Sequence, residues 1–194
     1  MSTQLDREID QIKNSLCEYE QKMAVVYKHY CEAIAGALAR QLIQASFQLC
    51  TRHYPQAFLT LSLEQRYQFQ QALQQLAKSA QQEAIAQLST LGPQAVIADQ
   101  ALDQALGQLL QQTSGRANQL LTEYQILPTD KSEAVIQLRA VEVEYTDRQV
   151  LNYRSEMRVI AGRYQQLQQE LAHKLHQKQI IDAELAWRST WSEI

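Results

Sequence analysis

The sequence predicts an all-α protein, an elongated up-down four-helix bundle whose first and last helices extend as an antiparallel two-helix coiled-coil stalk. Glycine (5) and proline (3) are scarce among the 194 residues, so we expect few turns and long elements. Apolar residues recur at alternating steps of four and three near both ends of the chain, the spacing of paired helices. We expect a single helical domain over residues 1–194, with helices at about 3–50, 62–91, 94–125 and 130–192. The bundle body would span about 20–160, and the stalk would pair about 1–20 with 160–194.

The first helix is expected to begin at Ser2 or Thr3, whose hydroxyls can cap the free amides of its first turn. Pro55 marks the end of this region, and we expect 51–61 to be irregular. The apolar ladder of this helix is Leu5, Ile9, Ile12, Leu16, Tyr19, Met23, Val26 and Tyr30. We expect this ladder to pack against the apolar ladder of the last helix.

The two middle helices are bounded by familiar end signals. Ser62 with Gln65 three residues later predicts a capping box. We expect one helix to end and the next to begin at Gly92-Pro93, because proline suits the first turn of a helix and not its interior. We expect a kink or short break at 113–115 (Thr-Ser-Gly), and an end at Leu127-Pro128.

The last helix is expected to run without interruption from a second capping box, Asp130 with Glu133, to about residue 192. Its stretch contains no proline, and its only glycine is Gly162. The ladder reads Tyr153, Met157, Ile160, Tyr164, Leu167, Leu171, Lys174, Lys178, Ile181 and Leu185.

The tip of the last helix is the predicted partner-binding site. If residue n pairs near 180 minus n, the segment 178–194 projects past the first helix with nothing from its own chain to cover it. Tryptophan and arginine are the residues that most often anchor interfaces. Alternatively, the tip folds back or the first helix is shifted, so that the tryptophans close the bundle. The predicted contact residues are Ile181, Leu185, Trp187, Arg188 and Trp191.

Lys174 and Lys178 occupy inward positions of the stalk, where polar residues weaken a coiled coil but set its register and pairing specificity. In the expected register Lys174 meets Asp6, within reach of Glu8 or Asp10. The alternative is that both lysine stems simply run past the seam to water.

Metal and thiol chemistry have weak support in the sequence. His173 and His176 share a helical face and could hold a metal with Cys17 or Glu18, although solvent-exposed histidines explain the pattern more simply. Glu170 and His173 have the spacing of di-iron bundles, but no second such pair exists. Cys50 is a candidate reactive thiol because Arg52 and His53 follow it. We expect free thiols, no metal and no cofactor.

The remaining patterns exclude whole function classes. A net charge of −3 without a basic stripe argues against nucleic acid, and no apolar run is long enough to span a membrane. The N-terminus is too polar for a signal peptide, so we expect a cytoplasmic protein. No nucleophile elbow or phosphate-binding glycine loop is present, so we expect neither an enzyme nor a small-molecule substrate. The glutamine-rich runs fit solvent faces of helices.

These observations favour a non-catalytic coiled-coil adaptor or scaffold that binds a protein partner, or a second copy of itself, through the tip. One alternative is reversible attachment to a membrane surface through the same tip, although the lysine-rich polar face typical of such helices is missing. Another is a metal- or ligand-binding helical bundle built on the histidine and cysteine positions.

Overall fold

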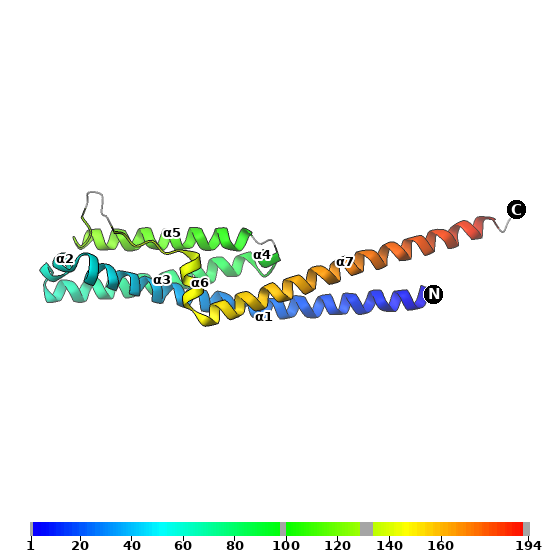
Figure 1. Ribbon diagram of the computed structural model, residues 1–194, viewed down its shortest axis with the longest axis horizontal. Helices are drawn as coiled ribbons and strands as arrows, with labels where there is room; N and C mark the ends of the chain where they lie inside the picture. Colours follow the sequence, from blue (N-terminus) through cyan, green and yellow to red (C-terminus); the bar gives the residue numbers. More distant parts are fainter. Residues whose placement is uncertain (1, 98–99, 129–133, 192–194) are drawn as a thin grey trace. The chain divides into compact units, whose positions relative to one another are not determined.

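The computed structural model describes residues 2–97, 100–128 and 134–191, and within these residues it is all-α, with no strand (Figure 1). The prediction of an all-α fold is confirmed. The elements are α1 (Ser2–Gln48), a π-helix η1 (Leu49–His53), α2 (Pro55–Thr60), α3 (Leu63–Leu91), α4 (Gln94–Ile97), α5 (Gln100–Glu123), α6 (Ala140–Thr146) and α7 (Arg148–Trp191). The side chains of Ser2 and Thr3 lie outside the described part of the chain.

Internal contacts divide the chain into two compact units, one of Met1–Val26 with Glu156–Ile194 and one of Tyr27–Ser155. The division falls within α1 and within α7, so each of these helices contributes to both units. We call Met1–Val26 with Glu156–Ile194 the helix pair, and Tyr27–Ser155 the large unit.

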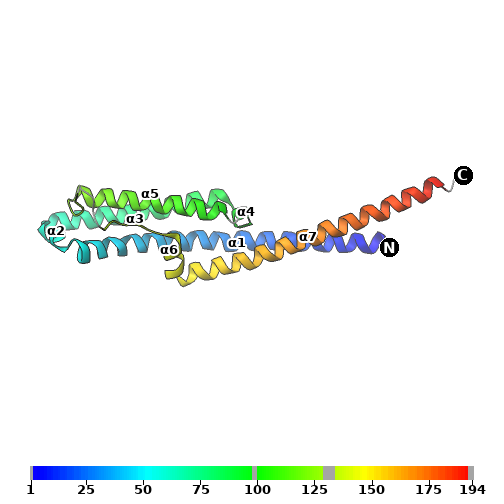
Figure 2. The same cartoon turned by 45° about the horizontal axis from the view of Figure 1, so that its top comes forward.

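The large unit is built around α3 and α5, which lie side by side in Figures 1 and 2. The α3 helix buries one stripe at helical spacing, and its three alanines leave little side-chain bulk between neighbouring backbones. From α1, Tyr27 donates a hydrogen bond of 2.6 Å to the carbonyl oxygen of Leu88. The buried stripe consists of Phe69, Leu73, Ala77, Ala80, Ala84 and Leu88.

The connection at 51–61, predicted to be irregular, is mostly helical, so that prediction is wrong. The backbone amide of Tyr54 donates to the carbonyl of Leu49, five residues earlier, which closes a π-turn, and Pro55 then begins α2. Proline fits there because the amide of a first-turn residue has no partner within the helix.

The capping box of Ser62 and Gln65 at the start of α3 is confirmed, with its two hydrogen bonds at 2.9 and 3.2 Å. Gly92, at φ 70°, ends α3.

The short break allowed at 113–115 is absent, because α5 runs unbroken through these residues. The hydroxyls of Thr113 and Ser114 donate to the carbonyl oxygens of Leu109 and Leu110, four residues earlier, at 2.8 and 2.7 Å. Both polar groups are therefore satisfied inside the helix. Residues 98–99, within the predicted helix 94–125, lie outside the described chain.

The predicted single helix over 130–192 is wrong in its first third. Residues 134–139 are irregular, α6 spans only 140–146, and α7 begins at Arg148. The backbone of Ile136 is held by the Asn118 side chain, which donates to its carbonyl at 2.9 Å and accepts from its amide at 2.8 Å. The amide of Leu138 donates to the hydroxyl of Ser114 at 2.9 Å. The predicted Asp130–Glu133 capping box lies outside the described residues.

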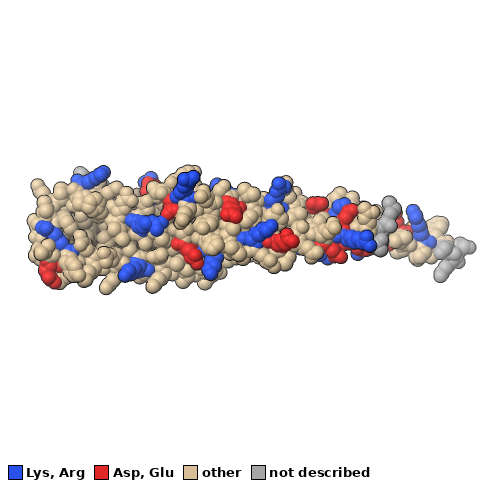
Figure 3. Space-filling view, turned by 90° about the horizontal axis from the view of Figure 1, so that it is seen from below, with Lys and Arg blue, Asp and Glu red and all other residues tan. Residues whose placement is uncertain are grey.

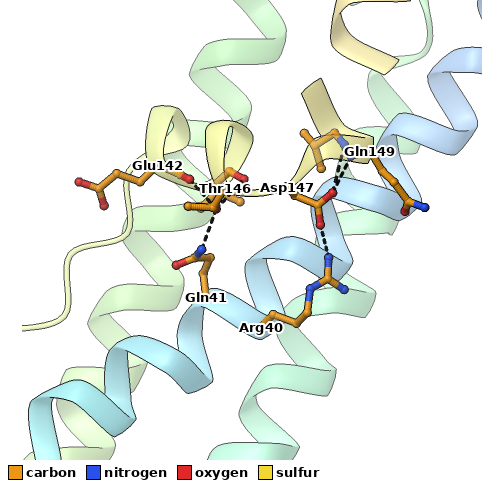
Figure 4. Close-up of polar contacts among 8 residues, drawn as sticks. Arg40, Gln41, Glu142, Thr146, Asp147 and Gln149 are labelled. Carbon is orange, nitrogen blue, oxygen red and sulfur yellow. Dashed lines mark hydrogen bonds and ion pairs between the residues drawn. The ribbon is translucent and has the colours of Figure 1, made fainter. Parts of the chain in front are cut away.

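The break between α6 and α7 is at Asp147, which has an extended backbone (Figure 4). Its carboxylate accepts hydrogen bonds from the amides of Gln149 at 2.9 Å and Val150 at 3.3 Å, and it forms an ion pair with Arg40. Burial raises the pKa of Asp147, but the two amide bonds and the charge of Arg40 outweigh this and lower it. The Asp147 carboxylate therefore accepts from two amides of the first turn of α7, which in a continuous helix would donate to carbonyls of the preceding turn.

Candidate partner-binding site

In the helix pair, the first part of α1 and the second part of α7 run antiparallel beside each other, as both ribbon views show (Figures 1 and 2). The hydroxyl of Tyr164 donates to Glu20 at 2.7 Å. Farther along α7, Lys174 donates to Glu8 at 2.7 Å and Lys178 donates to Asp6 at 2.5 Å. Residue numbers rise along one helix as they fall along the other, which establishes the antiparallel direction.

The two helices meet along a seam of buried and half-buried residues at alternating steps of four and three. Burial along α7 decreases toward its C-terminal end, since Met157 is fully buried, Lys174 is half-buried and Leu185 is 54% exposed. The α7 side consists of Met157, Ile160, Tyr164, Leu167, Leu171, Lys174, Lys178 and Ile181. The α1 side consists of Leu5, Ile9, Ile12, Leu16, Tyr19 and Met23.

The two seam lysines are both paired with acids of α1. Lys174 meets Glu8, while Asp6, the partner expected for it, pairs with Lys178. The hydrogen bond and the positive charge of Lys174 lower the pKa of Glu8, and the hydrogen bond to Asp6 raises the pKa of Lys178. Both lysines therefore contribute charge as well as aliphatic stem to the seam.

The tip, which we define as residues 180–191, presents its tryptophans to solvent. Trp187 is 65% exposed and Trp191 is 63% exposed, and their ring centroids lie 5.7 Å apart at an interplanar angle of 30°. Arg188, between them in sequence, is exposed, and Ile181 is half-buried. The two indoles therefore contact each other while about two-thirds of each remains exposed.

Ile180 belongs to the same face and is absent from the predicted contact set. A turn of about 100° per residue places Ile180, Trp187 and Trp191 within one narrow arc, roughly 120° around α7 from the seam. A search at a helical period of 3.6 residues, rather than along the ladder alone, would have found it. The tip therefore carries two apolar faces, one of Ile180 with the tryptophans and one of Ile181 with Leu185.

A shallow groove of about 410 Å³ lies between α1 and α7 just before the tip. Its lining comes from both helices and consists of Gln4, Leu5 and Glu8 of α1 and Lys174, Gln177, Ile180 and Ile181 of α7. The groove joins the last ion pairs of the seam to the first apolar residue of the tryptophan face.

The predicted metal ligands are not brought together. His173 and His176 are both exposed, and a ring nitrogen of His173 lies 3.1 Å from the side-chain nitrogen of Gln177. Cys17 is exposed, and its sulfur accepts from Gln21 at 3.8 Å. Within the described chain no group of three or more histidine, cysteine, aspartate or glutamate side chains is arranged to hold a metal ion.

The environment of Cys50 opposes the activation that Arg52 and His53 were expected to provide. Cys50 is buried within the π-helix η1, and burial raises its pKa to about 11. Burial likewise raises the pKa of Cys31 to about 11. Both groups are therefore protonated thiols near neutral pH, and thiols are poor nucleophiles.

On the face drawn in Figure 3, basic and acidic side chains are interspersed along the described residues. None of the helices in the described residues combines the length and the apolar character needed to cross a membrane.

Sequence reasoning missed a partly buried polar cluster, which lies in the large unit. Tyr30 of α1 donates to Glu144 of α6 at 2.7 Å, and Arg154 of α7 donates to Asp103 of α5 at 2.5 Å while its Nε lies 3.8 Å from Glu144. These residues come from four helices far apart in sequence, so no local pattern predicts them. The cluster anchors α6 and the start of α7 in the large unit.

Comparison of this chain with protein-family models, with curated proteins and with solved structures found no match in any of the three.

Proposed function

We propose that this chain is a non-catalytic adaptor or scaffold of the cytoplasm, which holds a protein partner, or a second copy of itself, through the tip of α7. In this proposal the helix pair acts as an antiparallel coiled-coil stalk, and the large unit acts as an up-down four-helix bundle body. The observation that carries it is the solvent exposure of Trp187 and Trp191 on one helical face.

The size of the exposed surface supports binding. An indole side chain buries 150–250 Å² in a protein core, so two that are about two-thirds exposed leave roughly 200–300 Å² of apolar area in water. The largest apolar patch on a typical monomer is roughly 300–600 Å² and is often functional, and Ile180, which is 47% exposed, extends the tryptophan face toward that size. The two tryptophan side chains also have few rotatable bonds to immobilise on binding, which keeps the entropic cost low.

A non-catalytic role is supported by the ion pairs of the seam lysines and by the raised pKa values of the buried thiols. The seam lysines are paired with acids, and the buried thiols have raised pKa values, so neither offers a nucleophile at neutral pH. Two buried free thiols also fit a reducing compartment such as the cytoplasm.

The test is affinity capture with the full-length chain, quantified by mass spectrometry for wild type and for the double variant Trp187→Ala/Trp191→Ala. We expect the variant to lose its specific partner while its helical circular dichroism is unchanged. The matched control is Phe47→Ala/Tyr67→Ala, which removes two aromatics of the large unit that are 63% and 59% exposed. Equal loss in both variants, or unchanged capture in the tryptophan variant, would contradict the proposal.

Attachment to a membrane surface is the second candidate, favoured by the exposed tryptophans, which partition well into lipid interfaces. Arg188 is the one cation among residues 180–191, whereas helices that lie on a membrane surface usually carry several lysines or arginines on their polar face. Flotation with phosphatidylcholine–phosphatidylserine vesicles separates the candidates. An adaptor stays at the bottom of the gradient, whereas a membrane-attached protein rises and the double tryptophan variant does not.

A further inference from the structure

The tip of α7 carries one charge of each sign between its two apolar faces. At about 100° per residue, Glu184 and Arg188 lie on the arc that separates the tryptophan face from the face of Ile181 with Leu185. Both charged side chains are exposed, and neither forms an ion pair with any other described residue. The exposed surface of the tip is therefore apolar at its edges and holds a glutamate and an arginine at its centre.

The third charged residue of the tip, Asp182, lies on another side of α7. The hydrogen bond and the charge of Asp6 raise the pKa of Lys178, and the charge of Asp182 adds to this effect. Asp182 is thus close to the end of the seam with α1, roughly 140° around α7 from the midpoint of Glu184 and Arg188. An occupant of the apolar surface accordingly meets one glutamate and one arginine.

A surface with this charge pattern is complementary to itself. If Glu184 of one tip lies opposite Arg188 of an antiparallel second tip, twofold symmetry places Arg188 opposite Glu184 as well. The two pairs then form one cluster of four alternating charges, and the same register sets Ile181 opposite Trp191 of the second copy. A parallel pair would set each charge against its own equivalent, so electrostatics favours the antiparallel arrangement.

The groove between α1 and α7 lies where this register places the indole of the second copy. Ile181 lines the groove together with Leu5 and Ile180, and its volume of about 410 Å³ lies in the range of small-ligand pockets. A tryptophan that fills a pocket is a common interface anchor. The second tip would therefore pack beside the start of α1 and continue the existing α1–α7 interface.

We propose that the tip is a self-association site, through which two copies of this chain form an antiparallel, twofold dimer. Trp191 of each copy enters the groove of the other, and Glu184 of each copy pairs with Arg188 of the other. The inference rests on the proposed function and identifies the partner as a second copy. A contact of about three helical turns falls below roughly 1,200 Å² in total, so we expect a transient dimer with a dissociation constant in the micromolar range.

Other occupants match the tip less well. Helices that lie on membrane surfaces carry an excess of cations around their apolar face, whereas the charges of Glu184 and Arg188 cancel. A different protein would have to present the same two charges in reverse order along an apolar helix. The second copy already supplies that arrangement.

Sedimentation velocity of the full-length chain tests the dimer. We expect the sedimentation coefficient to rise from the monomer value to the dimer value between about 1 and 200 µM. Fluorescence gives an independent readout, because the two tryptophans of the chain are both in the tip. Their emission maximum should move to shorter wavelength over the same concentrations, as the indoles leave water.

Charge reversal gives the decisive comparison. Arg188→Glu and Glu184→Arg each set like charges together and should each raise the dissociation constant at least about tenfold. An equimolar mixture of these two variants should dimerise again, because every arginine then meets a glutamate. The double variant Glu184→Arg/Arg188→Glu should behave as wild type.

The matched control is Arg158→Glu, which makes the same charge change at an exposed position of α7 outside the tip and should dimerise as wild type. A wild-type chain that stays monomeric over the whole range would overturn the inference. So would equal behaviour of Arg188→Glu and Arg158→Glu, or a mixture of the two tip variants that fails to associate.

The two proposals can fail separately. If Trp187→Ala/Trp191→Ala loses capture of a different protein while wild type sediments as a monomer, the adaptor proposal stands and self-association is wrong. If the charge variants respond as expected while capture of other proteins is insensitive to the tryptophans, self-association stands and binding of a different protein is wrong.

Discussion

The hydroxyl of Tyr30 donates a hydrogen bond of 2.7 Å to the carboxylate of Glu144, which joins α1 to α6 across 114 residues of sequence. Tyr30 is fully buried, and burial together with the neighbouring charge of Glu144 raises its pKa, so it remains a protonated donor throughout the physiological range. Glu144 therefore accepts this bond near the positive charge of Arg154, whose Nε lies 3.8 Å away.

Tyr30→Phe should destabilise the chain by about 1–3 kcal/mol, because it leaves a partly buried carboxylate without its donor. The measurement is urea denaturation followed by circular dichroism. Tyr145→Phe, at a side chain that is 70% exposed, is the control and should change nothing. Equal stability of the two variants would show that the Tyr30–Glu144 bond contributes no net stability.

Arg154→Met should cost about 1–3 kcal/mol, because it removes the positive charge near Glu144, whose side chain is only 17% exposed. Asp103, the other partner of Arg154, is 60% exposed and regains contact with water, so its lost ion pair adds little. Arg116→Met breaks an exposed pair with Glu83 and should cost less than about 1 kcal/mol. Similar losses in the two variants would contradict the cluster's anchoring role.

Asn118→Ala should release the segment at 134–139, because Asn118 supplies both side-chain bonds to the Ile136 backbone. We expect a loss of about 2 kcal/mol, and faster hydrogen exchange at the amides of Ile136 and Leu138 than elsewhere in the large unit. Gln119→Ala, one residue along α5 and exposed, is the matched control. If exchange at Ile136 is unaffected, the burial of Ile136, rather than Asn118, holds the segment.

The helix pair should lose stability at both ends of the pH scale. The pKa of Glu8 lies below 4.5 in the folded chain, so its contribution is present above pH 4.5 and is lost as the pH falls through the lowered value. The pKa of Lys178 lies above 10.5, so its contribution is present below pH 10.5 and is lost as the pH rises through the raised value.

Thermal melts of wild type, Glu8→Gln and Glu18→Gln measure the acid effect. Glu8→Gln should lower stability at neutral pH and flatten the acid decline, because the glutamine has no charge to lose. Glu18→Gln, an exposed residue of the same helix, should keep the wild-type profile. Identical acid profiles in all three would assign the decline to other carboxylates, such as Asp147.

Iodoacetamide should modify Cys17 alone in the folded chain. Cys17 is exposed, whereas Cys31 and Cys50 are buried with pKa values raised to about 11. Intact mass should increase by one adduct under native conditions and by three after denaturation. Native modification of Cys50 at the rate of Cys17 would mean that η1 opens readily.

Local patterns determined most of the helices. The apolar ladders of α1, α3 and α7, the Ser62–Gln65 capping box and the stop at Gly92 all depend on residues within a few positions of one another. Such signals can be recognised without knowing the fold, because helix caps and helical periodicity are local properties. The same periodicity placed Trp187 and Trp191 on one face of α7.

Only the tertiary structure decided the course of 134–147 and the surroundings of the tip. The sequence around Ile136 is compatible with a helix, but the side chains of Asn118 and Ser114 bind its backbone in a non-helical form. Likewise, the exposure of the tryptophans depends on the register of α1 against α7, and the ion pair of Glu8 with Lys174 identifies that register. Both outcomes arise from contacts between residues distant in sequence, and local propensity carries no information about those contacts.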